Sequence, residues 1–116
     1  MEPCLLMLLH VRPRHGYELA QDLAAFGMGQ VHASLVYRML RDMESEGLVA
    51  SQWQTDVSSG PARRIYRVTA LGDGSLGEWV AQLRETDQAL HRFLALYDRH
   101  MGEGEGDFHP KGSRAP

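Results

Sequence analysis

Apolar residues recur at three- and four-residue spacing along several stretches of the chain, and each such stretch predicts a helix. The first, Glu2 to Val11, leaves almost no polar face, so we expect it to be buried on several sides. Arg12-Pro13-Arg14 ends it. The second runs from about His15 to Phe26, and Gly27 is its expected stop. Its core-facing residues are Leu19, Leu23 and Phe26.

A third helix is predicted to begin near His32 to Ser34 and to end at Gly47, after a turn at residues 27–30 and after Val31, which we expect to fill the core. Ser34 fits the requirements of an N-cap, and Gly47 those of a left-handed stop. Its apolar stripe is formed by Leu35, Val36, Met39, Leu40 and Met43. The stripe leaves Arg38 and Arg41 free on the other side, and a DNA major groove accepts such a helix.

Two short runs of alternating β-branched and aromatic residues follow, at Leu48–Gln54 and Arg63–Val68. The segment between them, TDVSSGP at residues 55–61, is rich in turn formers. Together they predict a β-hairpin, whose second strand carries Arg63, Arg64 and Arg67. The expected fold is therefore mainly α with a small β-hairpin (α+β), in the form of a winged helix-turn-helix.

From Leu71 to about Met101 apolar residues recur at alternating steps of four and three, which predicts one long helix. A small domain cannot cover such a stripe alone, so we expect a C-terminal dimerisation helix that packs partly on the first helix and partly on a second subunit. The expected interface residues are Leu76, Trp79, Val80, Leu83, Leu90, Phe93, Leu94 and Tyr97. Asp87, the ionisable residue within the stripe, would fix the register or face water at the dimer centre.

The 116 residues thus divide into a winged helix-turn-helix (1–70), a dimerisation helix (71–101) and a Gly- and Pro-rich tail (102–116) that we expect to be disordered. A chain of this size is only marginally stable as a monomer. The single cysteine, Cys4, excludes an intramolecular disulfide and suits a cytoplasmic protein. The apolar run at residues 3–11 lacks the features of a signal peptide and is too short to span a membrane.

Three sequence blocks resemble the PadR-like family of transcriptional regulators: HGYELAQDL at 15–23, VYRMLRDMESEGLV at 36–49 and GPARRIYRVTALG at 60–72. Their order and spacing are similar to those of the family. The resemblance implies a homodimeric, usually repressing protein that binds a double-stranded DNA operator. The chain departs from the family pattern at Ser34-Leu35, at Arg38 and at Asp42, so the operator sequence cannot be carried over.

The recognition helix is expected to supply four DNA contacts, and the resemblance implies that the Tyr37 hydroxyl faces DNA. The alternative is a tyrosine ring packed against the second helix. Arg38 and Arg41 share one side and can reach phosphate or a guanine edge. Ser34 completes this part of the expected site.

The second helix and the wing are expected to supply the remaining contacts. His15 and Tyr17 can touch phosphate through the start of their helix, although Tyr17 could instead pack in the core. Strand alternation sends Arg63 and Arg64 to opposite faces, so at most one would enter the minor groove.

The two tryptophans are expected to be structural. Some relatives use a tryptophan of the last helix to stack planar ligands between subunits, which implies a small-molecule effector at the dimer interface. In this chain that position falls nearer Leu83, so Trp79 is interpreted as a core or interface residue. Trp53 should pack against the wing or the start of the last helix.

Charge and motifs limit the function classes. A formal net charge of −3 and a pI near 6.0 predict weak background affinity for DNA and reliance on a specific site. The six histidines show no HExxH-like spacing and no phosphate loop follows a strand, so we expect no enzyme, no metal site and no cofactor. A metal sensor using His91 and His100 is a minor alternative. The main alternative is a dimeric winged-helix interaction module that has lost DNA binding, which the acidic balance, Leu35 and Asp42 permit.

Overall fold

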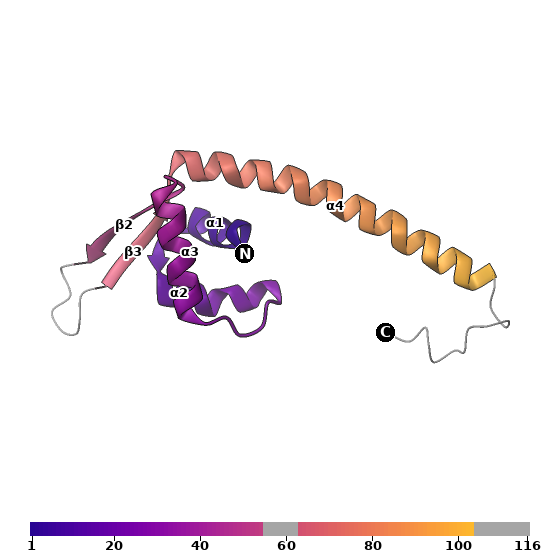
Figure 1. Cartoon of the computed structure of the whole chain (residues 1–116), viewed down its shortest axis with the longest axis horizontal. Coiled ribbons are helices and arrows are strands. Elements are labelled where there is room, and N and C mark those ends of the chain that lie inside the picture. Colours follow the sequence, from indigo (N-terminus) through magenta and orange to yellow (C-terminus); the bar gives the residue numbers. More distant parts are fainter. Residues whose placement is uncertain (55–62, 104–116) are drawn as a thin grey trace. The chain divides into compact units, whose positions relative to one another are not determined.

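The computed structural model describes residues 1–54 and 63–103. Its elements are α1 (Glu2–Val11), β1 (Arg14–His15), α2 (Gly16–Asp22), the 3-10 helix η1 (Leu23–Phe26), α3 (Ala33–Ser45), β2 (Val49–Gln54), β3 (Arg63–Val68) and α4 (Ala70–Glu103) (Figure 1). The chain is mostly helical, with one antiparallel sheet in the order β1-β3-β2, which confirms the predicted fold class. The predicted turn at 55–61 and the tail from 104 onward lie outside the described residues.

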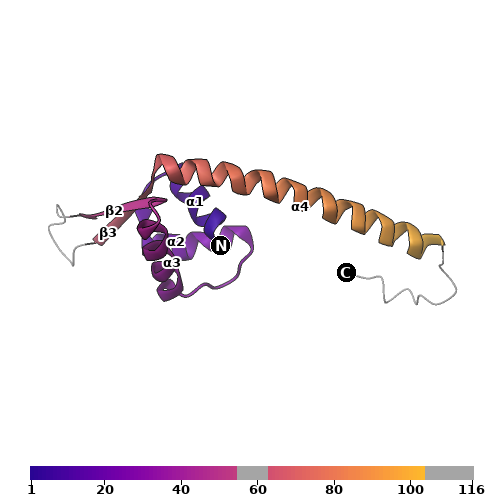
Figure 2. The ribbon, with the colours of Figure 1, turned by 45° about the horizontal axis from the view of Figure 1, so that its top comes forward.

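The chain divides into two compact units, Met1–Val80 and the part that begins at Ala81. In the first unit, α3 lies beside both α2 and the β2–β3 hairpin (Figure 1, Figure 2). Its core is built by side chains from every helix before α4 and from the hairpin: Leu5, Leu6, Leu9, Leu19, Leu23, Val36, Leu40, Met43, Leu48, Val49 and Tyr66. Val31 packs against this cluster, as predicted.

The first helix has the bounds that the sequence predicted, but its burial is one-sided. Leu5, Leu6 and Leu9 are fully buried, whereas Met7 and Val11 are exposed. Cys4 and Leu8 of the same helix also pack against the core, so α1 is covered on one broad side.

The second helix differs from the prediction at both ends. It begins at Gly16 with His15 as its N-cap, and the Glu18 carboxylate accepts a hydrogen bond from the His15 backbone N–H (3.0 Å). Its last turn is the 3-10 helix η1, in which Phe26 is exposed, so the expectation that Phe26 faces the core is wrong. Gly27 ends the segment in the left-handed conformation (φ 74°), as predicted.

The recognition helix α3 begins at Ala33, within the range of residues 32–34 in which the sequence predicted its start. His32 occupies the N-cap position, so the assignment of Ser34 as the cap is wrong, and Ser34 lies inside the first turn. The predicted stop at Gly47 (φ 81°) is confirmed. Leu48 N–H donates to the Met43 carbonyl (2.9 Å) and Gly47 N–H to the Glu44 carbonyl (3.0 Å), which is the Schellman pattern of helix termination.

The β2–β3 hairpin pairs its strands from Val49↔Val68 to Gln54↔Arg63, and this confirms the predicted hairpin. The sequence did not predict β1, whose two residues pair with Tyr66 and Ile65 of β3. Arg14 is buried there, and its guanidinium contacts the Asp22 carboxylate (2.6 Å). This ion pair ties the small sheet to the end of α2.

The start of α4 is fixed to the first unit at several points. The Thr69 hydroxyl donates to the Gly47 carbonyl (2.6 Å) and accepts the Gly72 N–H (3.0 Å). Trp79 Nε1–H donates to the Glu2 carboxylate of α1 (3.0 Å). Leu76 and Trp79 also pack against the core cluster, to which α1 contributes Leu5, Leu6 and Leu9. The helix continues to Glu103, past the expected end at Met101. Within the described ranges, no helix is both long and apolar enough to cross a bilayer.

Candidate nucleic-acid interface

One side of α3 is buried and apolar. The opposite, outer side is exposed, polar and basic. Val36, Leu40 and Met43 are buried. Positions at helical spacing on the other side are all exposed: Ser34, Arg38, Arg41 and Ser45. The helix therefore presents two arginines together, with Asp42 exposed beside them.

Tyr37 lies at the border of that face, and its side chain is 37% exposed. Its ring lies directly on Gly16 at the start of α2, where an added Cβ would come within 2.9 Å of the Tyr37 Cζ atom. The ring thus packs against α2 while part of the side chain remains accessible. A side chain at residue 16 would therefore force the Tyr37 ring to shift.

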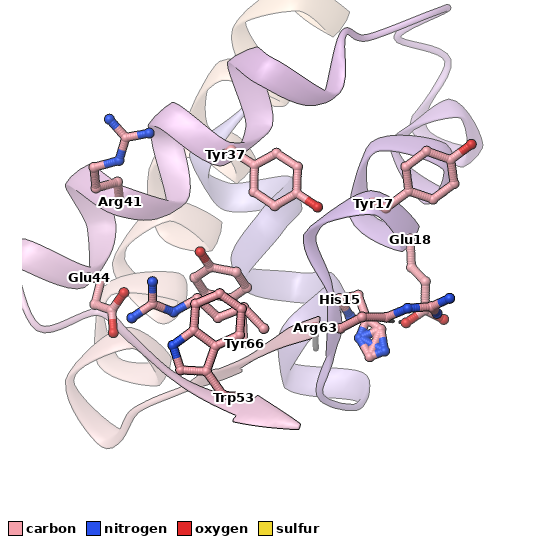
Figure 3. A pocket seen from close by; sticks show the side chains of 10 residues that line it. His15, Tyr17, Glu18, Tyr37, Arg41, Glu44, Trp53, Arg63 and Tyr66 are labelled. Carbon is pink, nitrogen blue, oxygen red and sulfur yellow. Dashed lines mark hydrogen bonds between the residues drawn. The ribbon is translucent and has the colours of Figure 1, made fainter. Parts of the chain in front are cut away.

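A cleft of about 850 Å³, here called the wing cleft, lies between α3, the start of α2 and the hairpin (Figure 3). Its lining residues are His15, Tyr17, Glu18, Tyr37, Arg41, Glu44, Trp53, Arg63, Arg64 and Tyr66. The cleft collects all the predicted DNA contacts except Ser34 and Arg38, which lie on the adjoining outer face of α3. Tyr17 is exposed at the cleft, so it does not adopt the alternative role of a core residue.

A hydrogen-bonded chain joins α3 to the hairpin at one wall of the wing cleft. The Glu44 carboxylate accepts from the Ser51 backbone N–H (3.1 Å) and from the Ser51 hydroxyl (2.8 Å). Arg64 Nε donates to the same Ser51 oxygen (2.9 Å), and its guanidinium lies 5.0 Å from the centre of the Trp53 ring. Trp53 thus packs against the wing, as expected. Arg64 is held in place by a stacking contact and a hydrogen bond.

Arg63 and Arg64 are both exposed, and both line the wing cleft. Strand alternation predicted opposite faces for them. Their long side chains nevertheless reach the same space, so the wing offers two cations to one cleft.

Tyr66 is the most deeply buried residue of the wing cleft. Burial raises the pKa of its phenol above the ordinary value of 10.0; the nearby Glu44 carboxylate acts in the same direction, and Arg64 opposes it. The phenol is therefore neutral at neutral pH and carries a hydrogen-bond donor.

The acidic residues of the cleft already have donors of their own. Glu44 is bound to Ser51, and Glu18 caps α2 and lies 3.7 Å from the Arg12 guanidinium. His15 Nδ1 is buried and, within the described part of the chain, has no hydrogen-bond partner. No group of three His, Cys, Asp or Glu residues in the described ranges could hold a metal ion.

Sequence reasoning missed Glu44, Ser51 and Tyr66 as parts of this site. A signal was present in the strand register, since Ser51 and Trp53 lie two apart on one face of β2. Their partners on β3 are Tyr66 and Arg64. The register between the two hairpin strands could not be inferred without knowing where each strand ends. The approach of Glu44 also depends on where the recognition helix lies.

The residues expected at a dimer interface fall into two groups. Leu76 and Trp79 are partly buried against the core of the first unit. The others have exposed side chains in the single chain: Val80, Leu83, Leu90, Phe93, Leu94 and Tyr97. Asp87 is exposed as well, and its backbone carbonyl contacts His91 Nδ1 (2.9 Å).

Comparisons with known proteins agree with this geometry. The model of the transcriptional regulator PadR-like family matches residues 5–78. Transcriptional regulator Rv3488 of Mycobacterium tuberculosis is 38% identical over 64 residues, which cover 55% of this chain and 57% of the relative. The crystal structure of a PadR family regulator from Eggerthella lenta is 32% identical, with a TM-score of 0.65 over 78% of this chain and 80% of that one. Bacillus subtilis PadR, solved in complex with operator DNA, shares the fold at 17% identity, with a TM-score of 0.61 over 99% of this chain and 82% of that one.

Proposed function

From the premise that the chain belongs to the PadR-like family of transcriptional regulators, which are not enzymes, we propose that it is a homodimeric, sequence-specific DNA-binding repressor of the cytoplasm. The observation that carries the proposal is the one-sided burial of α3, which leaves Arg38 and Arg41 exposed beside the wing cleft. The operator complex of Bacillus subtilis PadR supports the same mode of action.

In this mechanism α3 enters the major groove of an operator. Arg38 and Arg41 can donate to guanine edges or to phosphates, and the Tyr37 hydroxyl adds a polar contact from the border of the helix. Ser34 lies in the first turn of α3, where backbone N–H groups favour an anion. These residues would set the register of the protein on its site.

The wing and the start of α2 would contact the DNA backbone on either side of the major groove. Arg64 is already oriented by Trp53 and Ser51, so it loses little freedom on meeting a phosphate. Arg63, which is exposed and, among the residues that the structure describes, has no such contact with Ser51 or Trp53, would enter the minor groove. His15 and Tyr17 would contact phosphates beside the recognition helix.

A second copy of the chain would cover the exposed stripe of α4. Burying leucine and aromatic side chains contributes roughly 25 cal/mol per Å² of apolar surface, which favours association through this face. Two recognition helices related by a two-fold axis would then read half-sites about 34–36 Å apart. A small-molecule effector at the dimer interface would release DNA by changing the angle between those helices.

Light scattering during size-exclusion chromatography, followed by binding to labelled DNA from upstream of the coding region across a salt series, tests the proposal. We expect a dimer and a steep linear fall of log affinity with log salt. Arg41→Ala should weaken specific binding by about 1–3 kcal/mol if Arg41 reads a base, or flatten the salt slope if it meets only phosphate. Arg92→Ala, on exposed α4 surface, is the matched control and should change neither quantity.

The second candidate is a winged-helix interaction module without DNA binding. Exposed Asp42 beside the two arginines favours it, because a carboxylate there repels a nearby phosphate. A dimer that binds DNA weakly, with no sequence preference and no effect of Arg41→Ala, would support this module and contradict the repressor.

A further inference from the structure

We propose that the wing cleft is also a binding site for a small planar aromatic anion, which would occupy it in direct competition with DNA. The ligand site stands on the geometry of the cleft alone. Only the competition rests on the proposed DNA-binding function. At about 850 Å³ the cleft lies within the volume range of small-molecule sites.

The cleft contains more aromatic surface than a DNA backbone would use. Tyr37, Trp53 and Tyr66 come from three different elements and occupy the middle of the cleft (Figure 3). The Trp53 side chain is 55% exposed although it lines a concave surface. A phosphodiester has no ring face to stack on these side chains, whereas a planar aromatic ligand does.

The charges of the cleft favour an anion on that ligand. Arg41, Arg63 and Arg64 are exposed around the rings. The opposing carboxylates are engaged elsewhere, Glu44 with Ser51 and Glu18 with the His15 backbone N–H. A guanidinium therefore remains available for a charge-assisted hydrogen bond to a sulfonate, carboxylate or phosphate at the edge of the ring.

The wall formed by Arg64 and Trp53 is organised before any ligand arrives. Arg64 lies over the indole ring and donates to Ser51, which is itself fixed to Glu44 of α3. A preorganised wall reduces the conformational entropy that binding must overcome. A ligand seated here would cover Arg41 and Arg63, two of the residues that the proposed DNA complex needs.

Two-dimensional NMR of the ¹⁵N-labelled full-length protein, titrated without DNA, tests the site. The chain has two tryptophans, so Trp53→Phe assigns both indole N–H signals at once. The probe is 1-naphthalenesulfonate, and its neutral match is 1-naphthalenesulfonamide. We expect the sulfonate to shift the Trp53 signal and leave the Trp79 signal in place, because Trp79 does not line the cleft.

The anion should bind about tenfold more tightly than the sulfonamide, and Arg63→Gln should remove about tenfold of the sulfonate affinity. Arg92→Gln is the control and should leave that affinity unchanged. Equal affinity for the two probes, a shift of the Trp79 signal alone, or no shift at all would overturn the site.

A second titration measures release of labelled upstream DNA by 1-naphthalenesulfonate. Direct competition predicts that the apparent Kd for DNA rises in proportion to the probe concentration without reaching a limit. A plateau would overturn competition and indicate coupling between separate sites. Because the NMR titration contains no DNA, its result stays decisive for the ligand site even if the protein binds no DNA.

Discussion

Two leucine-rich helical segments of this chain have opposite environments. In α1, Leu5, Leu6 and Leu9 are fully buried in the core of the first unit. In α4 from Ala81 onward, every side chain up to His100 is exposed, including Leu90 at 54% and Phe93 at 63%. Both segments carry apolar residues at helical spacing. Spacing identifies the face of a helix that is to be covered, but it does not identify what covers it.

The difference is informative because exposed apolar stripes are costly in water. The core of the first unit is complete without the second half of α4, since its members come from residues 5 to 66. The exposed apolar residues of α4 from Ala81 onward therefore contribute nothing to the stability of the first unit in a single chain. A second copy of the chain is the partner that our proposed function assigns to them.

The largest effect is expected from a charge placed among the exposed apolar residues of α4, which tests whether a second copy of the chain covers them. Leu90→Glu would place an unpaired carboxylate in a dimer interface from each copy, and we expect the dimer dissociation constant to rise at least about hundredfold. Analytical ultracentrifugation across a concentration series measures it. The free energy of unfolding of the first unit should be little changed, because Leu90 lies outside that core.

Arg92→Glu is the matched control, since residue 92 lies two positions further along and on the opposite side of the helix. It should leave the dimer intact. If Leu90→Glu dimerises as tightly as the unmodified chain, the stripe is covered by something other than this interface.

The order and type of the elements followed from the sequence wherever local chemistry decides structure. Gly27 and Gly47 end their helices in the left-handed region, and the alternating runs form the hairpin. The exceptions have two causes, a distant segment in one case and a local change of helix type in the other. Strand β1 has only two residues and exists because β3 offers an edge to Arg14 and His15. Phe26 fits the predicted apolar face, but the chain tightens into a 3-10 turn that leaves it exposed.

Two glycines near the start of α4 differ in their surroundings, since one lies against other residues and the other faces open space. A Cβ at Gly72 would collide with the backbone carbonyl of Leu48, whereas a Cβ at Gly77 would meet nothing within 4 Å. Gly72→Ala should therefore destabilise the protein by about 1–3 kcal/mol through overpacking. Gly77→Ala should stabilise it by about 0.5–1 kcal/mol through helix propensity.

Urea unfolding followed by circular dichroism measures both changes. The pair controls for the substitution itself, because residue type and helix are the same. Equal effects at the two positions would contradict the close junction between the start of α4 and Leu48.

The candidate site was predicted less completely than the fold. The arginines and tyrosines were identifiable because the recognition helix and the wing are local features of the sequence. Their grouping was not, since Arg63 and Arg64 reach one cleft despite strand alternation. The hydrogen bond that Ser51 donates to Glu44 joins two elements whose separation depends on the whole fold. Tyr37 shows the packing against the second helix that was one alternative, because Gly16 leaves room for its ring; contact of its exposed part with DNA stays a prediction.

The smallest expected effect concerns pH and the buried wall of the wing cleft. Burial raises the pKa of Tyr66 above 10.0, so in the folded state its phenol stays protonated at a pH where the unfolded chain has begun to ionise. Below about pH 10 both states are protonated and this contribution to stability is fully present. As pH rises through the folded pKa, the free energy of unfolding falls. Tyr66→Phe removes that part of the decline, so urea unfolding at about pH 8 and about pH 10.5 should show a smaller loss in the variant. An identical decrease in the free energy of unfolding in both proteins would show that Tyr66 is not desolvated at the cleft. Tyr66 would then behave as an exposed side chain and not as a covered one.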